Sequence, residues 1–481
     1  MNITNGTSWY LRMIMVLGLA TAACGNNIVV TNVALSMAPA GYTDVQFDLS
    51  WSNSWRATWT ELSTATVVTN WDAAWVFVKF RANGDWVHAT LAQTGHTAPA
   101  GVSIDPTSDG KGALIHRSTS GSGDVSYTNG AIKLRWNYAA NGVVSANLVD
   151  VSVEAIEMVY VPSGSFYVGS GGSEAGSFYT YPTTTNPYLI TNEAAITVGT
   201  AAGNLYYATA ANQGDASGPI PALFPKGYTA FYCMKYEVTQ GQIADFLNKL
   251  TVTQAAIYPN QNGNSRYTIS GSYPNFVASA PDRACNWLTW GSMKAYAAWA
   301  GLRPMTELEF EKACRGVAAS VPNECAWGTT NIVLALGTSG TDGSGTETAT
   351  PGTANCNADR NNGGGFNGPV RAGIFATAIS TRELAGASYW GAMEMSGNLF
   401  ESLVTAGNSG GRNFAGSHGT GALSSLGVAT NADWPTAGGL RGGCYSTLRG
   451  SAMGVSDRTL GAYSPTAPDD HQGFRAVRTA P

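Results

Sequence analysis

The first part of the chain, residues 25–157, alternates apolar and polar positions in short runs. Residues 45–49 read Val-Gln-Phe-Asp-Leu, an alternation with the period of a half-buried strand. Turn dipeptides such as Asn141-Gly142 separate the runs and are typical of tight hairpins. Similar runs occupy residues 74–80, 86–91, 113–116, 132–136 and 149–155. The pattern predicts an antiparallel β-sandwich.

From residue 158 onward, helical patterns and long polar stretches replace the alternation. Residues 240–250 have the pattern of an amphipathic helix, and a second helix is predicted to end at Gly301. Thr306 and Glu309 form the Thr-x-x-Glu pattern of a capping box at the start of a third helix. Three stretches rich in small and polar residues look like insertions, namely residues 170–225, 323–354 and 406–435. Stretches this long are either functional and packed against a partner, or plain surface loops.

A series of short motifs runs through residues 158–481. In order, they read Tyr-Cys-Met-Lys-Tyr-Glu-Val-Thr at 232–239, Trp-Ala-Gly-Leu-Arg-Pro-Met-Thr-Glu at 299–307, Met-Ser-Gly-Asn-Leu-Phe-Glu at 395–401, Arg-Gly-Gly at 441–443 and Gly-Phe-Arg at 473–475. These motifs resemble those of the formylglycine-generating-enzyme family, also called the sulfatase-modifying-factor domain. The resemblance covers residues 158–481 and implies an α+β domain of the C-type-lectin-like kind, with long ordered loops, behind the all-β antiparallel sandwich.

The composition bounds the classes of protein to consider. With 481 residues, the chain is long enough for two to four domains at roughly 100–200 residues each. Charged residues make up 12% of the chain, about half of the usual ~25%. The net charge of -5 argues against a nucleic-acid-binding protein, which needs a basic patch. A charge-poor chain rich in Gly, Thr and Asn is typical of an extracellular protein.

Residues 1–24 have the features of an export signal. Arg12 precedes an apolar run, residues 13–20, that is too short to span a bilayer, and small residues then lead to Cys24. The segment is predicted to be a signal peptide cleaved after Ala-Thr-Ala at 20–22, or a lipoprotein signal with Cys24 as the lipidated residue. The alternative is a retained first helix or strand. An export signal predicts an extracellular or cell-surface bacterial protein with no transmembrane span in the mature chain.

The resemblance also implies a structural Ca²⁺ site. In the family, the Gly-Asn-x-Trp-Glu segment surrounds a calcium ion. By position, Glu394 and Glu401 would provide carboxylate oxygens, and Gly397 and Leu399 would provide backbone carbonyls. A second family site would include Asn355, but a glycine replaces the acidic residue that this site also needs. The alternative for residues 394–401 is an ordinary turn.

The cysteines decide between an enzyme and a relative without catalysis. Family enzymes place two cysteines after Arg-Gly-Gly to hold copper(I), whereas the matching positions here are Thr447 and Ala452, and Cys444 comes too early. We therefore expect no copper site. The chain has cysteines at positions 24, 233, 285, 314, 325, 356 and 444. Those after position 24 could form disulfides in an exported protein or remain buried thiols in the cytosol.

Two functions follow from these patterns. The first is an exported, non-catalytic surface protein that uses a lectin-like scaffold for binding or for self-assembly, with copies of itself or a cell-surface protein or glycan as its partner. Within residues 441–475 the candidate ligand contacts are Tyr445, Arg449, Asp457 and Arg458, with structural ion pairs as the alternative. The second function is a copper oxidase of the formylglycine type with a rearranged site that uses Cys444.

Overall fold

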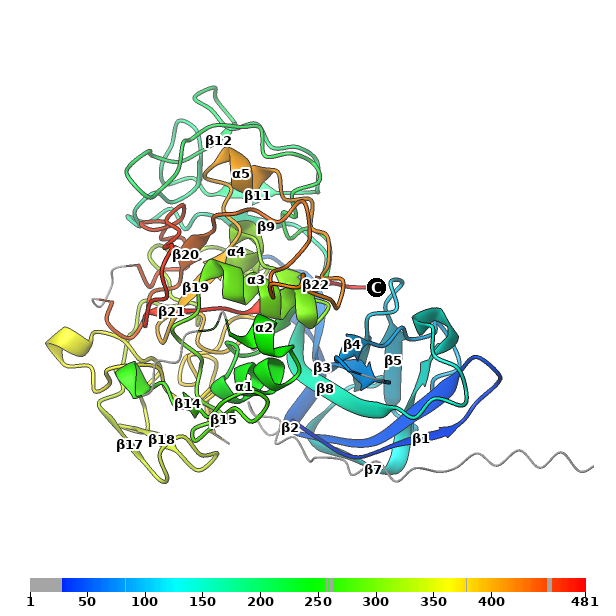
Figure 1. Cartoon of the computed structure of the whole chain (residues 1–481). Helices are drawn as coiled ribbons and strands as arrows, with labels where there is room; N and C mark the ends of the chain where they lie inside the picture. The colour runs from blue at the N-terminus through cyan, green and yellow to red at the C-terminus, as the bar shows by residue number, and fades with distance from the viewer. Residues whose placement is uncertain (1–27, 83, 257, 259–262, 378, 448–451) are drawn as a thin grey trace, which may run out of the picture.

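The computed structural model describes residues 28–82, 84–256, 258, 263–377, 379–447 and 452–481. A sheet of 11 strands is shared between an N-terminal β region and a larger mixed part of the chain. Figure 1 shows the β region on the right and the mixed part on the left. The expected α+β architecture, preceded by an antiparallel β region, is confirmed.

The β region follows the alternation of the sequence. Its elements are β1 (Val29–Met37), β2 (Thr43–Glu61), β3 (Thr66–Arg81), β4 (Val87–His88), β5 (Val102–Pro106), β6 (Ala113–Arg117), β7 (Gly121–Trp136) and the short helix η1 (Ala139–Asn141). All its strand pairs are antiparallel. Val45, Phe47 and Leu49 of β2 are buried and belong to one apolar core. The strand predicted over residues 86–91 is shorter than expected. Residues 87 and 88 pair with β3, whereas Leu91 forms an isolated bridge to Trp136.

Strand β8 (Asp150–Val161) joins the two parts of the molecule. Residues 150–159 pair with β3 of the β region, and residues 158–161 pair with β13 (Phe231–Met234) of the mixed part. The main path of the sheet is β1-β2-β3-β8-β13-β22-β16. The expected boundary between residues 157 and 158 therefore lies within one strand, and hydrogen bonds run through the sheet across it.

A row of aromatic side chains strengthens this connection. Arg56 lies over the ring of Trp71 at 4.1 Å, and Trp71 stacks on Tyr160 with ring centroids 3.8 Å apart. Tyr160 in turn pairs across the sheet with Tyr232, whose hydroxyl accepts a hydrogen bond from the Trp71 indole at 3.1 Å. Stacked aromatic neighbours add about 0.5–1.5 kcal/mol beyond their buried area. Trp71 thus packs between the two parts, whereas Trp51 and Trp136 belong to the core of the β region itself.

The α-helices of the mixed part begin at Thr or Asn caps. They are α1 (Gln240–Asn248), α2 (Val252–Ala255), α3 (Trp290–Trp299), α4 (Glu307–Arg315) and α5 (Ser409–Arg412), with the short helices η2 (Asn264–Arg266) and η3 (Arg360–Asn362). The capping box of Thr306 and Glu309 is confirmed, with both hydrogen bonds present. Gly301 follows α3 with a φ of 70°, the left-handed conformation that ends many helices.

Short strand pairs and loops make up the rest of the mixed part. Its remaining strands are β9 (Phe166–Val168), β10 (Tyr179–Thr180), β11 (Tyr188–Ile190), β12 (Leu205–Tyr206), β14 (Ile269–Ser270), β15 (Val277–Ala278), β16 (Arg303–Pro304), β17 (Gly337–Ser339), β18 (Thr348–Thr350), β19 (Phe400–Leu403), β20 (Gly439–Arg441), β21 (Gln472–Gly473) and β22 (Ala476–Thr479). Phe178, Phe224, Phe414 and Trp434 are buried in the main core, so the stretches 170–225 and 406–435 are packed rather than plain surface loops.

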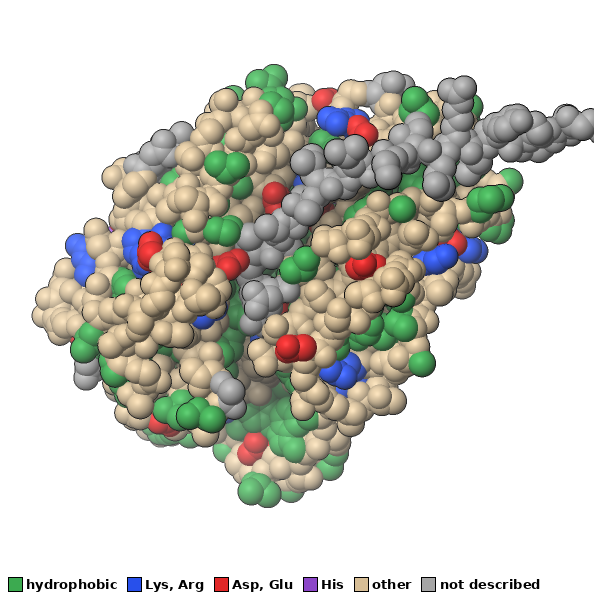
Figure 2. Space-filling view, turned by 90° about the horizontal axis from the view of Figure 1, so that it is seen from below, with side chains coloured by type: hydrophobic (Ala, Val, Ile, Leu, Met, Phe, Trp, Pro, Cys, Tyr) green, Lys and Arg blue, Asp and Glu red, His purple; other side chains and the backbone are tan. Residues whose placement is uncertain are grey.

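The surface carries few charges. On the face in Figure 2, charged side chains are scattered and most of the surface is neither charged nor apolar. No helix in the described part of the chain has the length and apolar character needed to cross a membrane.

Candidate functional site

The first residue of α4, Glu307, connects α4 to the C-terminal segment, residues 439–481. Its buried carboxylate accepts hydrogen bonds from Arg441 at 2.9 Å and from Arg458 at 2.7 and 3.1 Å. Burial alone would raise the pKa of Glu307, but Arg458 and Arg441 hold it below its ordinary value. Glu307 is therefore ionised and fixes two arginines of the C-terminal segment.

A second glutamate of α4 extends this arrangement. Glu311 accepts a hydrogen bond from Arg441 at 2.7 Å and another from Arg315 at 3.1 Å. Arg315 also pairs with Glu324. All of these side chains are buried. We call them the buried ion network, and its members are Glu307, Glu311, Arg315, Glu324, Arg441 and Arg458.

The other arginines of the sequence motifs are anchors as well. Arg303 forms a two-pronged pair with Glu309, at 2.6 and 2.8 Å. Arg475 donates to Glu401 at 2.5 Å and to the backbone oxygen of Met393 at 2.7 Å. Guanidinium groups suit such sites because several donors lie in one plane. The Arg-Gly-Gly and Gly-Phe-Arg motifs thus hold the C-terminal segment against the core.

The two acidic residues predicted to bind calcium are buried. One oxygen of Glu394 accepts the amide of Gly373 at 2.9 Å, and one oxygen of Glu401 is paired with Arg475. The second oxygen of each carboxylate, Oε2, has no hydrogen-bond partner among the described residues. Burial raises the pKa of Glu394 to about 7, and it also raises the pKa of Glu401. Buried acceptors without partners fit a hard cation, so the calcium prediction stays open at these two residues.

The backbone between the two glutamates makes a tight turn. Glu394 and Gly397 have φ values of 53° and 90°, and the amide of Leu399 donates to Glu237 at 3.0 Å. The second predicted site differs, because Asn355 uses its side-chain oxygen for the amide of residue 333 and its nitrogen for the carbonyl of residue 331. Asn355 therefore has less free bonding capacity for a metal than Glu394 or Glu401.

A cluster that the sequence analysis missed lies beside Tyr445. His471 places Nδ1 2.8 Å from a carboxylate oxygen of Asp469 and 2.9 Å from one of Asp470. Its ring stacks on that of Tyr445, with centroids 5.1 Å apart, and the Tyr445 hydroxyl donates to Asp470 at 2.8 Å. Hydrogen bonding to Asp469 raises the pKa of His471. In the described part of the chain, this is the one group of three acidic, histidine or cysteine side chains with ligand atoms within 4.8 Å of one another.

The predicted ligand contacts lie in different surroundings. Arg458 is buried in the ion network, with its guanidinium 4.1 Å from the ring centres of Phe178 and Tyr207. Asp457 is also buried and accepts the amides of residues 175 and 459. Arg449 lies outside the described residues. Tyr445 contacts the half-exposed cluster but is itself fully buried, and the role of all four in ligand binding stays a prediction.

Cys444 is a buried thiol beside two hydroxyl groups. Its sulfur lies 3.3 Å from Ser446 Oγ and 3.4 Å from Thr447 Oγ1. Burial raises the pKa of Cys444, so the neutral thiol is favoured. The six described cysteines are all buried, at positions 233, 285, 314, 325, 356 and 444. Of the two outcomes left open, the structure has thiols at positions 233, 285, 314, 325 and 444.

Comparison with known proteins agrees with the motifs. A family model, the sulfatase-modifying factor enzyme 1-like domain, matches residues 145–480. No curated protein matches the chain. Among solved structures, the Treponema denticola variable protein 1 aligns with 11% identity and a TM-score of 0.33, over 68% of this chain and 96% of that one. The match to the family model covers most of the sequence, and the chain belongs to the sulfatase-modifying factor enzyme 1-like domain family.

Proposed function

We propose that this protein is a non-catalytic binding protein that keeps the scaffold of its family without the copper-dependent oxidation. The surroundings of Cys444 carry this proposal. Copper(I) prefers a pair of thiolates, whereas Cys444 is one buried thiol with a raised pKa, and Thr447 beside it offers a hydroxyl. The buried ion network meanwhile retains the arginines that hold the C-terminal segment in place.

A copper titration tests the loss of oxidation chemistry. Reduced full-length protein is titrated with copper(I) in the presence of a cysteine-containing peptide, while an oxygen electrode records consumption. We expect no stoichiometric copper binding, no oxidised peptide and no oxygen uptake. A variant with a changed Cys444, Cys444→Ser, serves as the control and should behave like the wild type. Copper binding at one equivalent with oxygen uptake, abolished in Cys444→Ser, would show an oxidase instead.

The binding face that we propose consists of Asp469, Asp470 and His471, which are partly exposed. Tyr445 is fully buried beneath them, and its stacked ring holds His471 in place. Carboxylates and an imidazole at the surface suit recognition of polar groups. The partner is a copy of this chain or a protein or glycan on a cell surface. The export signal predicted for residues 1–24 supports an extracellular or cell-surface location for this activity.

Binding and assembly are measured on the same protein. Purified protein is applied to bacterial cells and to a glycan array, and its oligomers are imaged by electron microscopy. We expect binding or ordered polymers, lost in His471→Ala and kept in the surface control Arg81→Ala. A strict monomer without any binding, or binding that is unchanged in His471→Ala, would contradict the proposed face.

Calcium is proposed as a structural ion at Glu394 and Glu401, with the carbonyls of Gly397 and Leu399 as further ligands. When bound, the ion would neutralise the two buried carboxylates and brace the turn between them. The support is the pair of Oε2 atoms without partners. Adding EDTA should lower the melting temperature, and an unchanged melting temperature would remove this site.

A further inference from the structure

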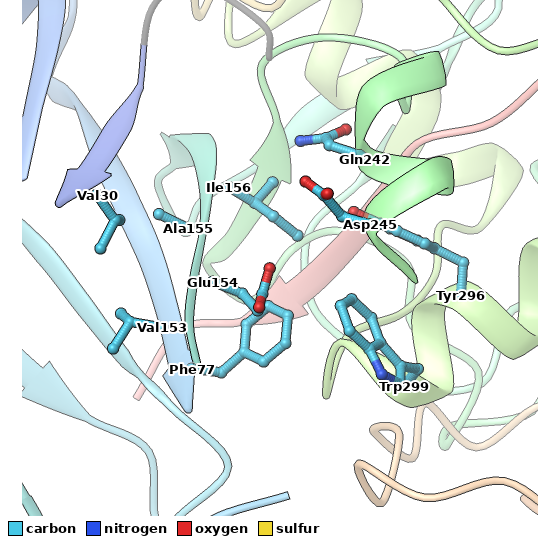
Figure 3. A pocket seen from close by; sticks show the side chains of 10 residues that line it. All are labelled: Val30, Phe77, Val153, Glu154, Ala155, Ile156, Gln242, Asp245, Tyr296 and Trp299. Atoms are coloured by element: carbon cyan, nitrogen blue, oxygen red, sulfur yellow. The ribbon is translucent and has the colours of Figure 1, made fainter. Parts of the chain in front are cut away.

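The pocket between the β region and the helices of the mixed part is too small for a ligand larger than water. Figure 3 shows that β3 and β8 line one side and α1 and α3 the other, with Glu154 and Asp245 in the wall. The cavity leaves about 20 Å³ for the centre of a water-sized group, and a volume of about 10–15 Å³ already holds one such group. Glu154 is paired with Lys249 at 3.0 Å. A larger molecule therefore has to bind elsewhere, and the stretch 170–225 offers a surface for it.

This stretch contains a two-stranded ribbon, β10 and β12. Figure 1 shows β12 among the loops at the top of the mixed part, away from β1 and β7. The two strands are antiparallel, with Tyr179 opposite Tyr206 and Thr180 opposite Leu205. Successive side chains of a strand point to opposite faces, so these two pairs lie on opposite faces of the ribbon. Leu205 belongs to the main core, which makes its face the inner one and the face of Tyr206 the outer one.

The residues that flank the ribbon anchor it to the C-terminal segment. Phe178 and Tyr207 are buried, and their rings meet edge to face with centroids 5.5 Å apart. The guanidinium of Arg458 lies 4.1 Å from both ring centres. Farther along the stretch, Asp215 forms an ion pair with Arg412 at 2.8 Å. The ribbon is therefore fixed to the buried ion network and presents its outer face in a defined orientation.

The outer face consists of three partly exposed tyrosines, Tyr179, Tyr181 and Tyr206, which we call the tyrosine face. Tyr206 packs edge to face against each of the other two, with ring centroids 5.8 Å apart in both pairs. Burial raises the pKa of Tyr179, and the nearby hydroxyl groups of Tyr206 and Tyr181 raise it further. Among the described residues, the three hydroxyl groups have no hydrogen-bond partner. The tyrosine face thus combines packed rings with neighbouring hydroxyl groups that are open to a ligand.

The charges of the stretch 170–225 indicate which ligand suits this face. The stretch contains no Lys or Arg. Its three acids are already bonded within the protein: Glu174 to the hydroxyl of Ser170, Glu193 to the amides of residues 226 and 229, and Asp215 to Arg412. An anionic ligand such as a nucleic acid or an acidic glycan would find no basic partner in this stretch. The composition therefore favours an uncharged polar ligand.

A neutral sugar has the chemistry that the tyrosine face can recognise. A tyrosine ring packs against the C–H groups of a sugar, and its hydroxyl both donates and accepts hydrogen bonds. The exposed residues that follow Tyr181 add further hydroxyl and amide groups, namely Thr183, Thr184, Thr185 and Asn186. Protein interfaces are enriched in Arg as well as Tyr, and Arg is absent from this stretch. A glycan is therefore favoured over a protein partner at this face.

We propose that the tyrosine face binds a neutral oligosaccharide. The rings of Tyr179, Tyr181 and Tyr206 contact the C–H groups of the sugar, and their hydroxyl groups bond to its hydroxyl groups. The site shares no residue with the face around His471 and does not depend on the function proposed for that face.

Isothermal titration calorimetry on the full chain tests the site with defined sugars. The probes are neutral hexasaccharides of glucose, of mannose and of N-acetylglucosamine, together with an acidic hexasaccharide of galacturonic acid. We expect saturable binding of at least one neutral probe and no binding of the acidic probe. The proposal is wrong if no neutral probe binds saturably, or if the acidic probe binds more tightly than every neutral one.

Variants of the tyrosine face assign the binding to it. Tyr206→Ala removes the ring that both aromatic pairs share and should weaken binding of the neutral probe about 10-fold. Tyr206→Phe keeps the ring and loses one hydroxyl, so it should weaken binding only about 3-fold. The matched control is Tyr42→Ala, which removes a partly exposed tyrosine of the β region and should bind as the wild type does.

Two further results would contradict the proposal. Unchanged binding in Tyr206→Ala, or a loss in His471→Ala instead, would assign the sugar to another face. Tyr181→Ala changes the same face and gives the same test if Tyr206→Ala does not fold. Sedimentation of the wild type and Tyr206→Ala identifies the other occupant: if no sugar binds and only Tyr206→Ala loses self-association, the face contacts a second copy of the chain.

Discussion

The β region and the family domain are held together by different forces. In the β region, long antiparallel strands satisfy their own backbone groups, and the core beneath them consists of apolar side chains such as Phe47 and Ile132. In the family domain, short strands and loops surround a core that contains paired arginines and glutamates. Loops lack a regular hydrogen-bond ladder, so buried side chains with several donors must fix them in place. The difference shows why the motifs of the family are rich in Arg, Glu and Gly.

Of the changes that test this comparison, removal of Glu307 should have the largest effect on the free energy of unfolding. Glu307→Ala removes one of the two carboxylate partners of Arg441 and the carboxylate that pairs with Arg458, and both arginines are buried. Breaking a buried ion pair typically costs about 3 to 5 kcal/mol. We expect a loss of about 5 kcal/mol in the free energy of unfolding, measured by urea denaturation. Glu383→Ala serves as the control. This half-buried acid of the same domain accepts hydrogen bonds from Thr329 and Asn331, so its loss should cost about 1 to 2 kcal/mol. A loss below about 1 kcal/mol for Glu307→Ala would mean that the ion network contributes little.

An apolar truncation in the β region should have a slightly smaller effect. Phe47 is fully buried, and Phe47→Ala removes an aromatic ring from the core under β2. Truncation of a buried Phe to Ala costs about 3 to 4 kcal/mol. Urea unfolding followed by tryptophan fluorescence measures the loss. Because β8 is shared between the two regions, we expect one transition in the variant. Two separate transitions would show that the β region unfolds by itself.

The buried acid Glu394 should make the family domain sensitive to pH. Folding raises its pKa from 4.5 to about 7. As the pH rises, Glu394 therefore loses its proton at a lower pH in the unfolded state than in the folded state. Without a bound cation, stability is full below about pH 4.5, falls as the pH rises to about 7, and stays low above that. Each pKa unit corresponds to about 1.4 kcal/mol, so a shift of about 2.5 units gives an expected loss of about 3 kcal/mol.

The variant Glu394→Gln distinguishes the effect of the buried acid on stability from the effect of bound calcium. The variant should lose the fall in stability between pH 4.5 and 7, measured by thermal unfolding at several pH values. Calcium should stabilise the wild type at pH 8 but not the variant. If both proteins respond equally to calcium, the ion binds elsewhere. If both show the same pH dependence, another group is responsible.

The sequence predicted the family, the strands of the β region and the capped start of α4. These features depend on local spacing, as in the alternation of residues 45–49 and the Thr306–Glu309 box. The contacts of Arg458 could not be predicted in this way, because its partner Glu307 is 151 positions away and only the fold brings them together. The same holds for the pocket, where Glu154 and Asp245 come from different regions. The Asp-Asp-His run at 469–471 was visible next to the Gly-Phe-Arg motif, but nothing in the spacing indicated that Tyr445 would stack on it.

An exposed ion pair of the β region provides the opposite extreme to Glu307. Arg81 and Asp150 lie 2.8 Å apart on the paired strands β3 and β8, and their side chains are 45% and 55% exposed. Water already solvates both charges, so the pair gains little from the contact and is weakened by salt. Asp150→Asn should therefore change the free energy of unfolding by less than about 0.5 kcal/mol, and this change should vanish in 1 M sodium chloride. The buried ion network should retain its contribution at the same salt concentration, because solvent ions do not reach it. A large, salt-resistant loss in Asp150→Asn would mean that the β region also depends on specific ion pairs, and the contrast between the two regions would then disappear.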